Sequence, residues 1–287
     1  MRGVYSMAGI RIAIRRTLAS IAFLVTLSAS ASTLLAQNVK LLVTVFDEKT
    51  GDSIADLRAE NFSVVDGETS LRVLSAERKE RTLDVLLLAD ASMLGGAIRP
   101  LVGPVIGELG EQDQMALVLY HESADLAQDF TSDKQRLLDA FTRFEYGGNP
   151  RAIDALYAGL DGGLTATSAS RAVLLLSSGV EGRSLTGLAE VHQLARRRTA
   201  PIHIVYYEGV DSGMFRRVAL NAGGAYFHAK KLKIEPDELA KKVFEAMRGV
   251  YELELSGVYT LGDRIGVEIV GLPKSKRKIR AGALPID

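Results

Sequence analysis

Runs of consecutive apolar residues recur through the middle of the chain, between segments whose apolar residues are spaced three and four apart. Continuous apolar runs suit parallel strands covered on both faces, and the wider spacing predicts helices with one buried face. The predicted strands are 83–89, 115–120, 172–176, 202–207 and 225–228, with an antiparallel edge strand at 124–130. The predicted helices are 98–109, 133–144, 151–160, 186–198 and 236–250. This alternation predicts an α/β fold with a doubly wound, mostly parallel sheet.

Shorter segments that alternate apolar and polar residues lie near both ends of the chain. The dipeptide Asp66-Gly67 stands between two of them and is a strong hairpin signal, because both residues can adopt a positive φ. The predicted strands are 39–46, 62–65 and 71–76 near the start, and 251–255 and 264–270 near the end, with a turn at 261–263. We expect the two groups to pair into one small β subdomain beside the α/β sheet.

The first 36 residues have the composition of a targeting segment. They hold four arginines and no acidic residue, and the arginines precede an apolar run rich in small residues. This pattern predicts a signal peptide, cleaved after Ala31 or Ala36, and an exported protein, periplasmic or secreted. The alternative is an uncleaved membrane anchor, because 17–36 is about long enough to span a bilayer, although its serines and threonines disfavour a permanent span. Contact with a membrane is expected only in that case.

The predicted organisation has four parts. They are a signal peptide at 1–36, a β element at 37–80, an α/β domain at 81–249, and strands at 250–287 that pack with the β element. Without the first 36 residues, 31 basic and 35 acidic residues leave a net charge near −4, which gives no reason to expect a nucleic-acid partner. The chain has no cysteine, so neither a disulfide nor a lipid-modified cysteine is possible.

A basic cluster lies near the carboxyl terminus. It comprises Lys274, Lys276, Arg277, Lys278 and Arg280. The favoured interpretation is an edge strand whose charges prevent pairing with other chains. The alternative is electrostatic attachment to anionic lipid or to an envelope polymer.

The segment with the clearest chemistry follows the first predicted parallel strand. There Asp90 and Ser92 stand at the carboxyl end of 83–89, where open α/β sheets place their ligand sites. The sequence Asp90-Ala-Ser-Met-Leu94 resembles the opening of the metal-ion-dependent adhesion motif of von Willebrand factor A domains, Asp-x-Ser-x-Ser. The segment 57–67 resembles the accessory segment of the acidobacterial von Willebrand A-related family. This resemblance implies a von Willebrand A-like domain at 81–249 in an exported bacterial protein for protein–protein interaction or cell adhesion.

The same resemblance implies that the metal site is degenerate. In the family, a divalent cation is held by Asp-x-Ser-x-Ser, by a threonine in a second loop and by an aspartate in a third. Here the last serine is Leu94, the threonine position falls on Pro150, and the aspartate position falls on Ser178. One carboxylate and one or two hydroxyls compete poorly with the hydration shell of Mg²⁺. Asn149 and Glu181 could offer substitute oxygens.

Two functional hypotheses follow. The first is a non-enzymatic domain for an unidentified protein partner, without a cofactor, whose Asp90 and Ser92 cap the local turn and the first helix. Its binding rim comprises the degenerate motif positions Asp90, Ser92, Leu94, Asn149, Pro150 and Ser178, made more apolar by Met93, Leu94 and Pro150. The second is a metal-dependent adhesin that binds Mg²⁺ or Mn²⁺ through Asp90, Ser92, Ser178 and Glu181. The pattern indicates no particular partner or oligomeric state.

An enzyme is the third and weakest hypothesis. Neither Ser92 nor Ser178 lies in the Gly-x-Ser-x-Gly motif of serine hydrolases. The four histidines, His121, His192, His203 and His228, are scattered and make no recognisable spacing with a carboxylate. No Gly-x-Gly-x-x-Gly follows the first strand, which disfavours a dinucleotide cofactor. We therefore expect no catalytic residues.

Overall fold

The computed structural model describes residues 39–143, 145–164, 170–256, 265–272 and 278–286. The predicted signal peptide, the turn at 261–263 and the basic residues Lys274, Lys276 and Arg277 lie outside these residues. Within them, no helix has both the length and the apolar character needed to cross a membrane.

The centre of the fold is a six-stranded sheet in the order β10-β9-β8-β5-β6-β7. Its strands are β5 (Leu83–Asp90), β6 (Gln114–Tyr120), β7 (Ala124–Thr131), β8 (Ser170–Ser177), β9 (Ile202–Tyr206) and β10 (Tyr226–His228). All pairs are parallel except β6 with β7. The first of these strands in the chain, β5, lies in the middle of the sheet. Strands β6 and β7 follow on one side of it, and β8, β9 and β10 follow on the other. The predicted doubly wound sheet is confirmed, and its order reverses between β5 and β8, where such sheets bind ligands.

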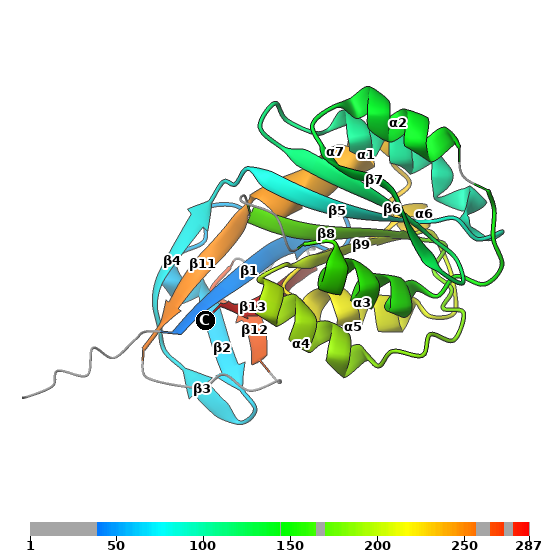
Figure 1. Cartoon of the computed structure of the whole chain (residues 1–287). Helices are drawn as coiled ribbons and strands as arrows, with labels where there is room; N and C mark the ends of the chain where they lie inside the picture. The colour runs from blue at the N-terminus through cyan, green and yellow to red at the C-terminus, as the bar shows by residue number, and fades with distance from the viewer. Residues whose placement is uncertain (1–38, 144, 165–169, 257–264, 273–277, 287) are drawn as a thin grey trace, which may run out of the picture. The chain divides into compact units, whose positions relative to one another are not determined.

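Helices cover both faces of this sheet (Figure 1). One face carries α1 (Val102–Gly107), α2 (Lys134–Thr142) and α7 (Pro236–Arg248), and the other carries α3 (Ala152–Gly162), α4 (Leu188–Arg198) and α5 (Ser212–Asn221). The short helix α6 (Ala229–Leu232) follows β10. The expected helix 98–109 is instead a series of short pieces, η2 (Gly95–Ala97), η3 (Arg99–Leu101) and α1, because Pro100 and Pro104 each lack a backbone N–H. Helix α5 was not predicted.

Strand β5 forms the centre of the core. All eight of its residues are buried, as expected for a strand with neighbours on both sides and helices on both faces. Each leucine buried here contributes roughly 1.5–3 kcal/mol relative to exposure. Helix α3 lies close against β5, since a Cβ at Gly159 would stand 2.8 Å from Leu86 Cδ2. The apolar run therefore fixes the position at which Asp90 leaves the sheet.

Strands from the two ends of the chain pair with each other, as predicted, but in two sheets. The four-stranded sheet has the order β13-β1-β11-β4, and the three-stranded sheet has the order β12-β2-β3. Their bounds are β1 (Val39–Asp47), β2 (Phe62–Asp66), β3 (Thr69–Leu71), β4 (Val73–Lys79), β11 (Val250–Leu255), β12 (Ile265–Ile269) and β13 (Ile279–Ile286), with the 3-10 helix η1 (Ala59–Asn61) before β2. The hairpin at Asp66-Gly67 is confirmed as β2–β3. The single predicted strand 71–76 is wrong, because Leu71 ends one sheet and Val73 begins the other.

Strand β1 connects the β subdomain with the α/β part. Its residues Leu41, Val43 and Val45 pack in the core of the β subdomain, and Phe46 contacts Tyr226 with ring centroids 5.1 Å apart. The buried Thr44 Oγ1 donates to Gly223 O at 2.7 Å.

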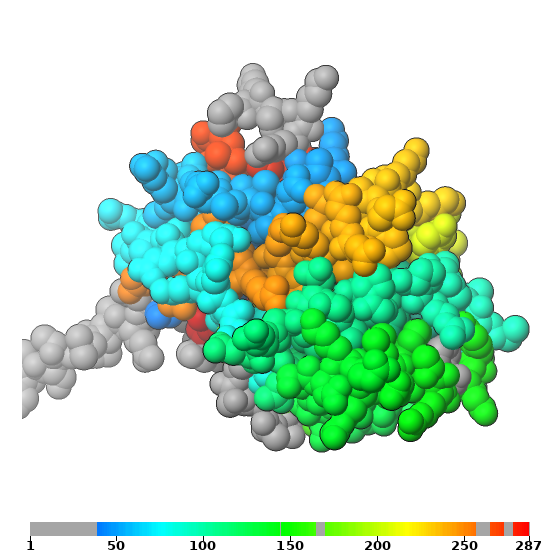
Figure 2. Space-filling model, turned by 90° about the horizontal axis from the view of Figure 1, so that it is seen from above, coloured from blue at the N-terminus to red at the C-terminus, as the bar shows by residue number. Residues whose placement is uncertain are grey.

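Helix α7 reinforces this connection. Its Lys242 forms an ion pair with Asp52, which follows β1, and its Arg248 forms one with Asp113 within the α/β part. Figure 2 shows the orange surface of α7 between the blue and cyan residues of the N-terminal strands and the green residues of α2. Apolar packing and charge pairing therefore hold the β subdomain against the α/β part.

Candidate functional site

The loop after β5 is organised by the carboxylate of Asp90. This side chain is 4% exposed, and its Oδ1 accepts a hydrogen bond from Ser92 N at 2.9 Å. Its Oδ2 accepts one from Ser178 N, also at 2.9 Å, although Ser178 follows β8. Ser92 Oγ in turn accepts from Leu94 N at 3.2 Å. Asp90 therefore joins the first loop to the third across the point where the strand order reverses.

This arrangement corrects part of the expected capping role. Asp90 and Ser92 do cap the local turn, as predicted. They do not cap a helix, because η2 begins without a side-chain cap and both Asp90 oxygens bond elsewhere. Sequence reasoning missed the link to Ser178, since the donor is a backbone N–H that carries no sequence signature.

The second loop is attached to the first through its backbone. Ser92 forms a parallel bridge with Gly147, Gly147 N donates to Ala91 O at 2.9 Å, and Met93 N donates to Gly147 O at 3.2 Å. A Cβ at Gly147 would stand 2.1 Å from the ring of His121, so this position requires glycine. Gly147 thus allows the second loop to pack closely against His121.

Glu181, in the third loop, holds the start of α3. Its Oε1 accepts from Ser184 N at 2.7 Å, and its Oε2 accepts from Ile153 N at 3.3 Å. Gly182 N donates to Pro150 O at 2.8 Å, which joins the third loop to the second. All three loops are thus connected by hydrogen bonds that involve the backbone.

Two titratable groups nearby have pKa values set by this packing. Burial alone would raise the pKa of Asp154, but N–H donors of Thr186 and Leu185 outweigh it and lower that pKa below its ordinary value. Burial raises the pKa of the Tyr120 hydroxyl well above its ordinary value, and the negative charge of Asp90 adds to the effect. Both groups keep their ordinary charge states near neutral pH and support the loops.

The side chains present do not fit a divalent cation. Asp90 and Glu181 already use both carboxylate oxygens as acceptors for backbone N–H groups. Pro150 has no side-chain oxygen, and Mg²⁺ requires near-octahedral oxygen ligands. Within the described part of the chain, no group of three or more histidine, aspartate or glutamate residues could hold a metal ion.

The exposure of the predicted rim residues divides them into two groups. Asp90, Ser92, Pro150 and Ser178 are buried, so a partner could not contact them without rearrangement, whereas Leu94 and Asn149 are exposed. Pro150 therefore adds nothing to an apolar contact surface, contrary to expectation. In the described structure Ser178 Oγ is buried without a hydrogen-bond partner.

Exposed apolar side chains gather around this edge of the sheet. Of the ten large hydrophobic side chains exposed in the described residues, six lie in the loops that follow β5, β8 and β9 or precede α3. We call these six the apolar rim: Met93, Leu94, Tyr146, Leu185, Tyr207 and Val210. Met93, Leu185 and Val210 are 81%, 87% and 91% exposed. Exposed apolar side chains in neighbouring loops are candidates for an interaction surface. Sequence reasoning found only Met93 and Leu94.

Three of the four histidines serve the backbone. His203 Nδ1 accepts from Ala225 N, His121 Nδ1 from Glu122 N, and His228 Nδ1 from Lys231 N. His203 lies inside β9 and is fully buried. The structure therefore gives these side chains local structural roles, in agreement with their scattered positions.

No protein-family model and no curated protein matches the chain. Among solved structures, the chain is similar to the SpRpn10 VWA domain, with 12% identity and a TM-score of 0.43 over 56% of this chain and 95% of that one. It is also similar to the conserved hypothetical protein BatB from Bacteroides thetaiotaomicron, with 15% identity and a TM-score of 0.45 over 58% and 98% of the two chains. For proximal thread matrix protein 1 from the mussel byssus, the values are 13% and 0.49 over 60% and 49%. These likenesses concern the fold alone.

Proposed function

We propose that this chain is a non-enzymatic, exported interaction module with a von Willebrand A-like α/β domain, which binds a protein partner through the apolar rim without a cation. The observation that supports this proposal best is that buried polar side chains and exposed apolar side chains have different roles at the carboxyl edge of the sheet. The buried Asp90, Ser92 and Ser178 form hydrogen bonds that hold the loops, and exposed apolar groups surround them. Loops on a rigid sheet are a common recognition surface.

The connections between the loops support the proposal of binding without metal. In a cation-dependent site, the ion would join the three loops and attract a carboxylate of the partner. Here Asp90 joins the first and third loops, and Gly147 joins the second to the first. A partner would therefore meet a preformed apolar surface, and burial of Met93, Leu185 and Val210 would provide the binding free energy.

The test places a photo-crosslinking amino acid at Leu185 in the cell that exports the protein. We expect one partner, identified by mass spectrometry, to be joined to the rim position. A crosslinker at Leu74, on β4 and outside the rim, serves as the positional control. The second part is Met93→Asp, which should lower the yield from position 185 by about tenfold or more, because a carboxylate would have to be desolvated in the contact.

The matched control substitution is Leu126→Asp, on the edge strand β7, where the side chain is also exposed. It should leave the crosslink unchanged. Equal yields from Met93→Asp and Leu126→Asp would contradict the use of the rim. So would the same set of products at positions 185 and 74, since that result indicates random collision.

A further inference from the structure

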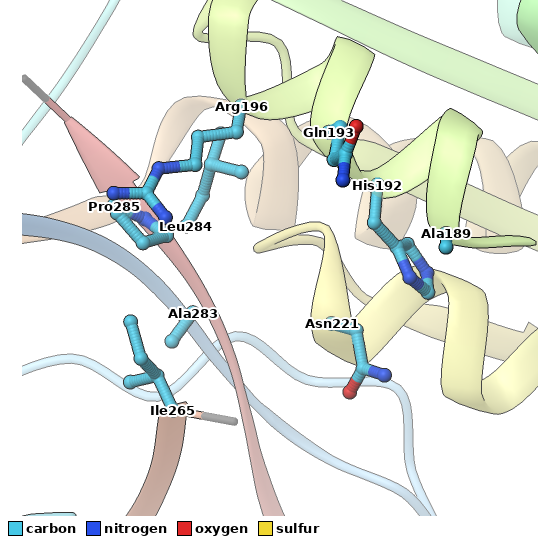
Figure 3. A pocket seen from close by; sticks show the side chains of 9 residues that line it. All are labelled: Ala189, His192, Gln193, Arg196, Asn221, Ile265, Ala283, Leu284 and Pro285. Carbon is cyan, nitrogen blue, oxygen red and sulfur yellow. The ribbon is translucent and has the colours of Figure 1, made fainter. Parts of the chain in front are cut away.

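A cavity of about 130 Å³ lies where α4 and the end of α5 meet strands β12 and β13 (Figure 3). Its polar wall is formed by His192, Gln193 and Arg196 of α4 and by Asn221 at the end of α5. In Figure 3 the guanidinium of Arg196 lies beside Leu284 and Pro285, and His192 points towards Asn221. The chain thus presents several polar side chains to one partly open space.

The opposite wall is apolar and continues into a groove. Ile265 and Ala283 line both the cavity and an adjoining groove of about 430 Å³. The groove is lined by all five residues of β12 and by residues of β13, together with Leu220 and Asn221 of α5. Six of the strand residues that line it are apolar and alternate along the strands: Ile265, Val267 and Ile269 on β12 and Ile279, Ala281 and Ala283 on β13. These six side chains also pack on the core of the β subdomain, and none except Ala283 is fully buried. The groove is therefore an open side of that core.

The charges along this path differ at its two ends. The residues lining the cavity include one arginine and one histidine and no acid. The acid that lines the groove, Glu268, lies three residues along β12 from Ile265, away from the cavity end. Arg280, which also lines the groove, pairs with Glu48. A ligand that matches this pattern has an anionic head and an apolar tail.

We propose that the cavity and groove bind a medium-chain carboxylate, with its head at Arg196 and its tail between β12 and β13. A guanidinium has five N–H donors in a planar fork, so Arg196 can bind a carboxylate as well as groups of its own chain. The five residues of β12 span about 13 Å, a length suited to the tail of decanoate. Alternate apolar residues on facing strands would cover both sides of that tail.

The test is calorimetric titration of the purified chain with decanoate below its micelle concentration. We expect saturable binding, and Arg196→Gln should weaken it by roughly tenfold to a hundredfold, as expected for loss of a charge-assisted hydrogen bond. Arg197→Gln is the matched control, because Arg197 is the exposed neighbour on the same helix and does not line the cavity. Decanol should bind with an affinity that Arg196→Gln leaves unchanged, and butyrate should bind more weakly than decanoate.

A second variant tests the tail. Ala281→Leu fills the groove at a half-buried position and should weaken decanoate more than butyrate. Thermal melting identifies any variant that fails to fold. Absence of saturable decanoate binding to the wild type overturns the proposal, and so does equal weakening by Arg196→Gln and Arg197→Gln, which would indicate binding to surface charge.

Discussion

Replacing Asp90 by alanine is expected to lower the free energy of unfolding by about 3 kcal/mol or more. The carboxylate is 4% exposed and accepts hydrogen bonds from Ser92 N and Ser178 N, so its removal leaves two buried donors without acceptors. Each unsatisfied buried donor costs roughly 1–3 kcal/mol. Urea denaturation of the wild type and Asp90→Ala, with chelator present in both samples, measures the difference.

Two variants make this result specific. Asp125→Ala removes an exposed carboxylate that accepts a bond from Ser123 Oγ, and it should change stability by no more than about 0.5 kcal/mol. Asp90→Asn keeps one acceptor oxygen and should lie between the wild type and Asp90→Ala. A wild-type-like midpoint for Asp90→Ala would show that the loops do not depend on this carboxylate.

Acidification is expected to destabilise the protein through His203. Burial lowers the pKa of this side chain from 6.5 to about 3, and in the described structure its Nε2 has no hydrogen-bond partner. Below pH 6.5 the unfolded chain binds a proton at this histidine, while the folded chain does so only near pH 3. Stability is therefore lost as the pH falls through this window, by up to about 1.4 kcal/mol per unit and about 4–5 kcal/mol in all.

The comparison variant is His203→Asn. Its side-chain oxygen can replace Nδ1 as the acceptor for Ala225 N, and it does not titrate. Stability curves for the two proteins should diverge as the pH is lowered from 6.5, with the wild type falling more steeply, whatever their difference at neutral pH. Parallel curves would mean that His203 can be protonated in the folded state.

The position of the candidate site could be predicted from the sequence because it depends on a strong local signal. Strand β5 is a continuous apolar run, and its first acid after Asp84 is Asp90, at its carboxyl end. The alternation of strands and helices then predicts the sheet. The small β subdomain was also predictable as a pairing of the two ends, since its strands alternate apolar and polar residues.

Other features depend on contacts that leave no sequence pattern. Helix α5 buries only Phe215, Val218 and Ala219, a weak periodic signal in a segment that opens with Ser212-Gly213. The change of sheet between Leu71 and Val73 follows from pairing with strands near the other end of the chain. Leu185 and Val210 lie in irregular loops, so their exposure could be recognised only from the structure.

The residues that resemble the adhesion motif have structural roles. Asp90, Ser92 and Ser178, at three of the positions that bind a metal in the family that the sequence resembles, are buried, and the Asp90 carboxylate connects two of the loops. The proposed contact surface lies around them. The proposed partner site therefore depends on loops held together at the carboxyl edge of the sheet, and it does not depend on a bound cation. The proposed carboxylate site is lined by other residues than the apolar rim, and its test is independent of the test of the rim.

The central claim is that this edge is complete without a cation. The most direct measurement follows the melting temperature of the purified chain with chelator and then with rising millimolar Mg²⁺, Mn²⁺ or Ca²⁺. We expect no saturable change, for the wild type or for Asp90→Asn. A saturable rise with Mg²⁺ or Mn²⁺ that Asp90→Asn abolishes would contradict it, because only a ligand bound to the folded state stabilises in this way. That result would favour the metal-dependent adhesin instead.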